Sequence, residues 1–108
     1  TLWEGGVPLA GSTDCPVEPL DAMAAIGQMV HRPDWSPDEG IPLDATLQIF
    51  SEGSYALQGY RRPPGGWGPG RRADFVVLDR NPWRTPPEEL EGIPIGMTVV
   101  DGRIVYGG

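Results

Sequence analysis

Asp14 is the residue of this chain whose type and position are best suited to chemistry. It follows the apolar run at residues 7–10, which predicts a short buried strand, and a polar connection at residues 11–13. A carboxylate just after the C-terminal end of a parallel barrel strand is a frequent catalytic position. There it can bind a divalent metal or take a proton from a water molecule. The other interpretation is a turn aspartate that bonds its own backbone, and spacing alone leaves both open.

The other reactive side chains have plainer interpretations. The chain has one cysteine, Cys15, which excludes an internal disulfide and a zinc cluster of cysteines. We interpret Cys15 as a small, partly buried thiol and the single histidine, His31, as a packing or helix C-terminal residue. Asp74 and Asp79 flank an apolar run and resemble a carboxylate pair, but turn and edge positions explain them more simply.

Composition limits the partners and the size of the core. The 108 residues include 16 glycines and 13 prolines, and 39% are hydrophobic, so we expect a small core surrounded by long loops. The net charge of −7 repels phosphate backbones, which argues against a nucleic-acid partner, and the arginines of segment 61–72 are expected to be solvated or paired with acids. No apolar run approaches the roughly 18–20 residues of a membrane span, and no signal peptide is recognisable. We therefore expect no membrane partner and a cytoplasmic location.

The predicted elements fall into two blocks joined by a loop. Apolar spacing predicts helices over residues 19–32 and 43–57, and Gly53 within the second helix would permit close packing. Strands are predicted over 73–78, 95–100 and 103–106, with a helical turn at 88–91. The Asp101-Gly102 pair between the last two strands is a strong hairpin signal. We divide the chain into residues 1–60, a Pro/Gly/Arg loop at 61–72, and residues 73–108.

Four tryptophans, at positions 3, 35, 67 and 83, lie in predicted loops. They could line an aromatic binding surface, but we expect them to clamp loops onto the small core. If the binding surface were real, the chain would be a non-enzymatic interaction module that uses these loops and an open β edge. That module is the alternative to an enzyme.

Three segments together resemble the metal-dependent amidohydrolases, in the branch that contains N-substituted formamide deformylase-like enzymes. Residues 7–23 (VPLAGSTDCPVEPLDAM) are similar to the family's "G-S-D-x-P-V…D-P" segment. Residues 68–82 (GPGRRADFVVLDRNP) are similar to its "P-G-K-x-A-D-F-V-V-L-D-x-D-P" segment, and residues 98–106 (TVVDGRIVY) to its closing strands. The segments occur in the family's order and span nearly the whole chain.

The resemblance implies an α/β fold that is the C-terminal part of a larger enzyme. Residues 1–60 would be the last strand of a TIM barrel with the helices that follow it, and residues 73–108 the C-terminal strands of a small composite β-sandwich. Asp14 would be the last-strand aspartate that binds the metal, with zinc expected, and that serves as general acid and base. The substrate would be a small molecule with an amide-type C–N bond.

The resemblance also implies what the chain lacks. The family's His-x-His and its other metal ligands would lie upstream, and Ser12-Thr13 and Arg71 depart from the family pattern. Because a catalytic zinc takes three protein ligands, we expect the 108 residues alone to be inactive and to hold no metal. Since Thr1 is not a start residue, we expect a fragment, whose partner is the missing N-terminal part or a second copy.

Overall fold

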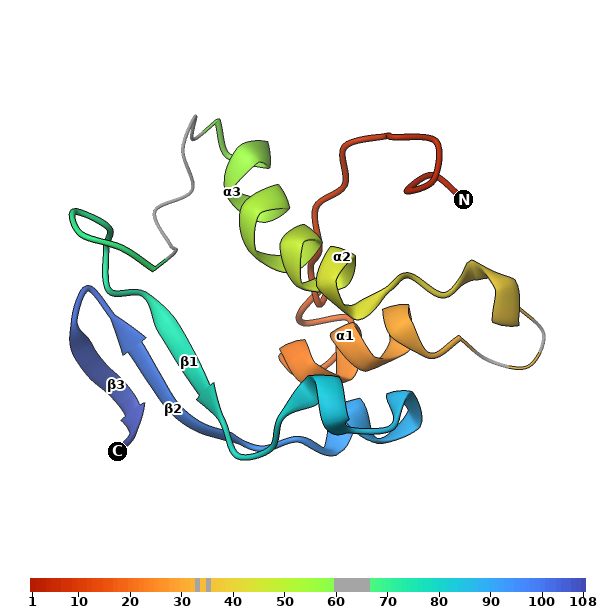
Figure 1. The fold of residues 1–108 in the computed structure, drawn as a ribbon. Helices are drawn as coiled ribbons and strands as arrows, with labels where there is room; N and C mark the ends of the chain where they lie inside the picture. Colours follow the sequence, from red (N-terminus) through yellow and green to blue (C-terminus); the bar gives the residue numbers. More distant parts are fainter. Residues whose placement is uncertain (33, 35, 60–66) are drawn as a thin grey trace.

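A computed structural model describes residues 1–32, 34, 36–59 and 67–108, and it shows a small α/β chain (Figure 1). The regular elements are α1 (Ala22–Val30), α2 (Leu43–Gln48), α3 (Ser54–Leu57), β1 (Phe75–Leu78), β2 (Ile95–Val100) and β3 (Arg103–Gly107). Short 3₁₀ helices at Pro37–Glu39, Pro82–Arg84 and Pro87–Gly92 and a π-helical segment at Ile49–Gly53 complete the order. Within the described residues, no helix is long and apolar enough to cross a membrane.

Helix α1 starts three residues later than predicted. Pro19 was expected in its first turn, but Asp21 is the N-cap and its carboxylate accepts the Ala24 N–H at 2.9 Å. This side-chain bond satisfies a donor that an uncapped helix start would leave unpaired. The helix ends at Val30, and the His31 N–H donates to the Gly27 carbonyl at 2.8 Å.

The second predicted helix is confirmed as one continuous helical rod over residues 43–57. Its middle, Ile49–Gly53, is π-helical and separates α2 from α3. A π-helical turn changes which backbone groups pair inside the helix, so carbonyls there can accept bonds from outside. Residues 9–11 run against this turn.

The sheet is antiparallel, in the order β1–β2–β3. The predicted hairpin is confirmed: Asp101 and Gly102 have φ of 51° and 75°, the positive values that a tight two-residue turn requires. The Asp74 carboxylate accepts the Asp101 N–H and so ties the start of β1 to this turn.

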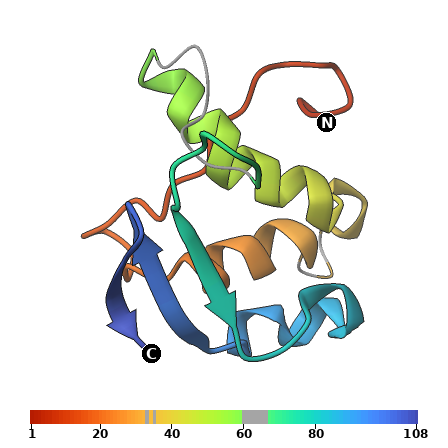
Figure 2. The ribbon, with the colours of Figure 1, turned by 60° about the vertical axis from the view of Figure 1, so that its left-hand side comes forward.

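The core lies between α1 and the helical turn Pro87–Gly92. Met23, Ile26, Leu90 and Ile93 are its buried centre, and Leu43, Leu47, Phe50, Leu78 and Ile95 pack around them. Gly27 allows the close approach, since a Cβ there would lie 3.1 Å from the Glu91 nitrogen. Figure 2 shows α1 between the 43–57 rod and this turn.

Two expectations are corrected here. Residues 7–10 were predicted as a buried strand, but they form an irregular segment in which Val7 is 45% exposed. A strand needs a neighbouring backbone, Pro8 lacks an N–H, and the three strands of the described residues pair only with one another. Leu20, which falls within the predicted helix at 19–32, is 81% exposed because the helix starts after it.

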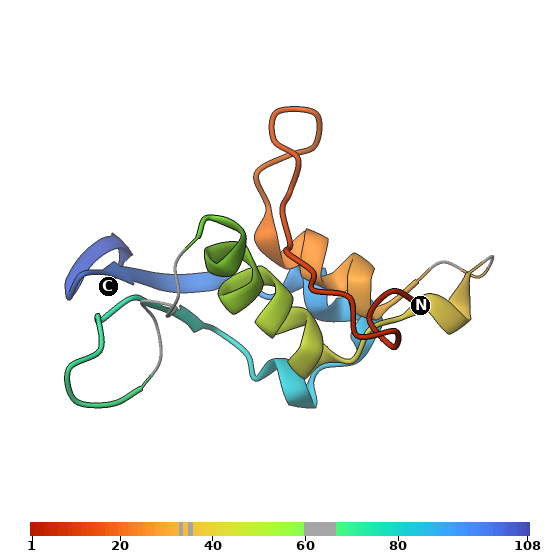
Figure 3. The same ribbon diagram turned by 90° about the horizontal axis from the view of Figure 1, so that it is seen from above.

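The predicted loop at 61–72 lies partly outside the described residues, which resume at residue 67. Residues 67–72 form turns and bends without helix or strand, as expected. The connection before α1, which contains Asp14, stands out from the body of the molecule (Figure 3).

Candidate functional site

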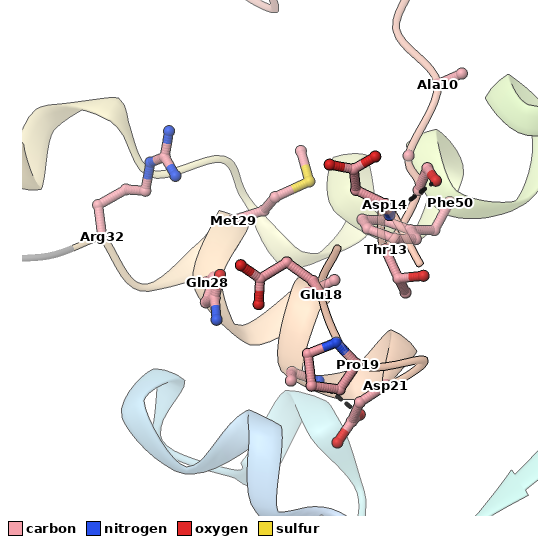
Figure 4. Close-up of a pocket in the computed structure, with 14 residues that line it drawn as sticks. Ala10, Thr13, Asp14, Glu18, Pro19, Asp21, Gln28, Met29, Arg32 and Phe50 are labelled. Atoms are coloured by element: carbon pink, nitrogen blue, oxygen red, sulfur yellow. Dashed lines mark hydrogen bonds between the residues drawn. The ribbon is translucent and has the colours of Figure 1, made fainter. Parts of the chain in front are cut away.

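A cleft of about 490 Å³ lies between the connection at residues 10–19 and helix α1 (Figure 4). Asp14 and Glu18 contribute to its wall from the connection, and Phe50 contributes from the π-helical turn. The cleft is therefore built by segments from the first half of the chain.

Helix α1 forms the floor of the cleft, because one of its faces packs in the core and the other faces the cleft. Met23, Ile26 and Gly27 are buried in the core. The other face supplies the small side chains Ala24 and Ala25 and the longer ones that line the cleft: Asp21, Gln28, Met29 and, beyond the helix end, Arg32. One helix thus joins the core to the cleft.

The segment before Asp14 is docked on the π-helical turn. The Gly11 N–H donates to the Ile49 carbonyl at 3.0 Å, and the Ser54 hydroxyl donates to the Gly11 carbonyl at 2.9 Å. A Cβ at Gly53 would collide with the Leu9 carbonyl, so only glycine fits this approach. The expectation of close packing at Gly53 is confirmed, and the contact fixes the chain three residues before Asp14.

Asp14 itself has a fixed backbone and an unbound carboxylate. Its φ of 57° is in the left-handed region, its N–H donates to the Ser12 hydroxyl at 3.2 Å, and its carbonyl accepts the Val17 N–H at 2.8 Å. Within the described part of the chain, no hydrogen bond or ion pair involves its carboxylate, and the residue is exposed. The turn is thus built by backbone and Ser12, which leaves the carboxylate available to an external group.

The described residues do not by themselves fit a catalytic metal. Residues 1–32, 34, 36–59 and 67–108 bring together no group of three His, Cys, Asp or Glu side chains that could hold an ion. Asp14 offers the right donor type but only one ligand, whereas a catalytic zinc takes three from protein. A complete site would require ligands from outside this part of the chain.

The remaining sequence candidates take structural positions. Cys15 is exposed, which corrects the expectation of partial burial, because its connection projects from the body. His31 caps the C-terminal end of α1, as expected. Asp74 supports the hairpin turn, and the Asp79 N–H donates to the Pro94 carbonyl at 3.0 Å. Neither aspartate belongs to the cleft.

Two of the tryptophans contact other segments, but the expectation that they clamp loops onto the core is wrong for them, since Trp67 is 89% and Trp83 63% exposed. The Trp83 indole N–H donates to the Asp44 carboxylate at 2.7 Å, linking the turn Pro82–Arg84 to α2. The Trp67 ring lies 5.4 Å from that of Phe75 between centroids. Trp3 is 39% exposed, and Trp35 lies outside the described residues.

Gln28 and Arg32 are the cleft residues that sequence reasoning missed. Gln28 lies on the α1 face that also carries Ala24 and Ala25, and Arg32 follows the end of the helix on the same side. Their spacing of four residues is a signal that the sequence does contain.

The comparisons with known proteins agree with one another. The sequence model of the amidohydrolase family matches residues 1–106. YtcJ of Bacillus subtilis (strain 168), whose name assigns it to the amidohydrolases, is 32% identical over 98% of this chain and 22% of its own length. The N-substituted formamide deformylase of Arthrobacter pascens is 30% identical over 93% of this chain and 19% of its own. No solved structure matches the chain at a significant level.

These matches show which family the chain belongs to and how much of its relatives' length it covers. The chain spans about a fifth of the length of the curated relatives it matches. The family match covers nearly all of the chain, including the connection that carries Asp14, the helices and the hairpin. On this evidence the chain belongs to the amidohydrolase family.

Proposed function

We propose that the chain is part of a metal-dependent hydrolase of amide-type C–N bonds, in which Asp14 is the catalytic carboxylate. The observation that carries the proposal is the unbound Asp14 carboxylate, which lines a cleft and whose backbone is held by Ser12 and the π-helical turn. Family membership supplies the reaction class, and one relative is named as a deformylase of N-substituted formamides.

The proposed role of Asp14 is to move one proton. Its carboxylate takes the proton of a water molecule as the water oxygen bonds to the amide carbon, and returns it to the nitrogen as the C–N bond breaks. The products are a carboxylic acid and an amine, so atoms and charge balance. A positioned carboxylate that acts as base and then acid contributes roughly 10²–10⁴-fold to such a reaction.

We also propose that Asp14 is one oxygen ligand of a divalent metal, with zinc the expected ion. The remaining ligands would come from the full-length protein outside these residues, since the described ones form no metal-binding group. A bound ion of this kind acts as a Lewis acid and lowers the pKa of a bound water. The isolated 108 residues are accordingly proposed to be inactive.

The architecture proposed for the full-length protein follows the family. Residues 1–60 would complete a TIM-like barrel, and residues 73–108 would join a composite β-sandwich, at the C-terminal end of the protein. The wide exposure of residues 7–20 and of the hairpin supports this, because both would then meet further chain.

The test is amine release by the full-length protein from a panel of N-formyl and N-acetyl amides, with Asp14 changed to Asn. Turnover is expected in the native protein and lost in the variant, while the fold survives. Normal turnover in the variant would contradict the role of Asp14. A native protein that releases no amine from any amide of the panel would contradict the hydrolase itself.

A further inference from the structure

The cleft beside Asp14 has an uneven distribution of charge. Asp14, Glu18 and Asp21 are its carboxylates, and Arg32 is the one cation among the described residues that line it. Figure 4 shows the Arg32 guanidinium on the opposite side of the cleft from the Asp14 carboxylate, with the Met29 side chain between them. A ligand that occupies the cleft therefore meets an acidic side and a basic side.

Arg32 is held at the cleft and its guanidinium is not used elsewhere in the described structure. The residue follows the His31 cap of α1, is half-buried and lines the cleft. Among residues 1–32, 34, 36–59 and 67–108, its side chain makes no hydrogen bond or ion pair. By contrast, Arg72 faces Asp74 at 3.5 Å and Arg80 faces Glu89 at 3.7 Å.

From this placement we infer that Arg32 binds an anionic group of the substrate, and that the preferred substrates are amides that carry a carboxylate remote from the C–N bond. A guanidinium binds a carboxylate through two parallel N–H donors, a strong and directional contact. Gln28, four residues earlier, also lines the cleft.

The acidic side chains of the cleft would also orient a substrate that binds Arg32 through its carboxylate. Glu18 and Asp21, which are not proposed metal ligands, repel a substrate carboxylate, so Arg32 is its favoured position in the cleft. The chain as a whole carries a net charge of −7 and repels anions, which makes Arg32 the local exception. The amide is thereby directed toward Asp14. This inference rests on the proposed function, because it assigns a substrate class to the same cleft.

The experiment compares two substrates that differ in one charge, N-formyl-6-aminohexanoate and its methyl ester, with the full-length protein. The native protein is expected to have the higher kcat/KM for the carboxylate. Arg32→Gln is expected to lower that value by about 10- to 100-fold, mainly through KM, and to leave the ester unaffected. The preference for the carboxylate is also expected to weaken as salt is raised.

The control is Arg103→Gln, since Arg103 lies on β3 away from the cleft, and it is expected to change neither substrate. Hydrolysis of both substrates with no preference, and no effect of Arg32→Gln, would overturn the inference and leave the hydrolase intact. An equal loss on both substrates would make Arg32 a structural residue and also overturn it. Activity on other panel amides but on neither probe would overturn it as well, whereas no activity on the whole panel would contradict the proposed function.

Discussion

At the scale of single residues, Asp14 combines a constrained backbone with an unbound carboxylate. Its positive φ is costly for a residue with a side chain, and such conformations persist only where the surroundings hold them. Here the holding groups are Ser12 and the contact of Gly11 with Ile49. The position of the carboxylate thus depends on atoms that do no chemistry themselves.

Gly53→Ala tests that dependence. Alanine normally favours a helix over glycine by up to about 1 kcal/mol, but here its Cβ would collide with the Leu9 carbonyl. We expect the collision to prevail and to lower the free energy of unfolding by about 1–2 kcal/mol net, as measured by urea denaturation of the full-length protein.

The matched control is Gly5→Ala, where the added Cβ would lie 3.5 Å from the Leu2 carbonyl, an ordinary contact. It is expected to leave the unfolding free energy nearly unchanged. If Gly53→Ala were as stable as the native protein, the docking of residues 9–11 on the π-helical turn would not exist in solution.

Sequence reasoning found Asp14 but not the environment that makes it useful. The residue type and its place after an apolar run were visible in the sequence. The free state of its carboxylate was not, because it depends on the Val17 N–H donating to the Asp14 carbonyl rather than to the carboxylate. Arg32 was not predicted as a site residue, because it lines a cleft that exists only where the connection at 10–19 packs against α1.

At the scale of elements, the sequence predicted an element correctly where the conformation of that element is set by its own residues. The hairpin was found from Asp101-Gly102 because a tight turn needs positive φ at both positions. The 43–57 rod was found from apolar spacing, but its π-helical turn was not, because that turn is paired with residues distant in sequence. The strand predicted at 7–10 failed for the related reason that a strand requires a partner.

Trp83→Phe tests how the two halves of the chain are held together. The change keeps an aromatic ring and removes the indole N–H that donates to Asp44 at 2.7 Å. Because the Trp83 side chain is 63% exposed, we expect a loss of only about 0.5–1 kcal/mol in the free energy of unfolding.

Trp67→Phe is the matched control, since its contact with the Phe75 ring is one that phenylalanine can keep. Urea denaturation of the two variants makes the comparison. Equal stability of Trp83→Phe and the native protein would show that the bond to Asp44 does not contribute.

At the scale of the whole molecule, much apolar surface is uncovered. The hairpin side chains Ile104, Val105 and Tyr106 are each about 60% exposed. A groove of about 620 Å³ is lined largely by apolar residues, among them Trp3, Leu9 and Ile49. Soluble monomers seldom leave large apolar patches in water, and the chain spans only about a fifth of the length of its relatives.

The isolated 108 residues are therefore expected to associate with one another. Their open β edges and apolar groove would be buried in that association. Light scattering is expected to give a mass well above the 11.7 kDa of one chain. A monomer at that mass with a cooperative melting transition would contradict the account of the uncovered surfaces.

The most direct test of the central claim is the turnover number of the full-length protein with Asp14→Asn, measured as amine released from an N-formyl amide. Asparagine keeps the size and polarity of the side chain but cannot hold the proton, so we expect kcat to fall by at least about 10²-fold. Asp38→Asn, an equivalent change in the exposed turn Pro37–Glu39, is expected to keep native turnover, and both variants are expected to melt like the native protein. Native turnover by a correctly folded Asp14→Asn protein would contradict the account.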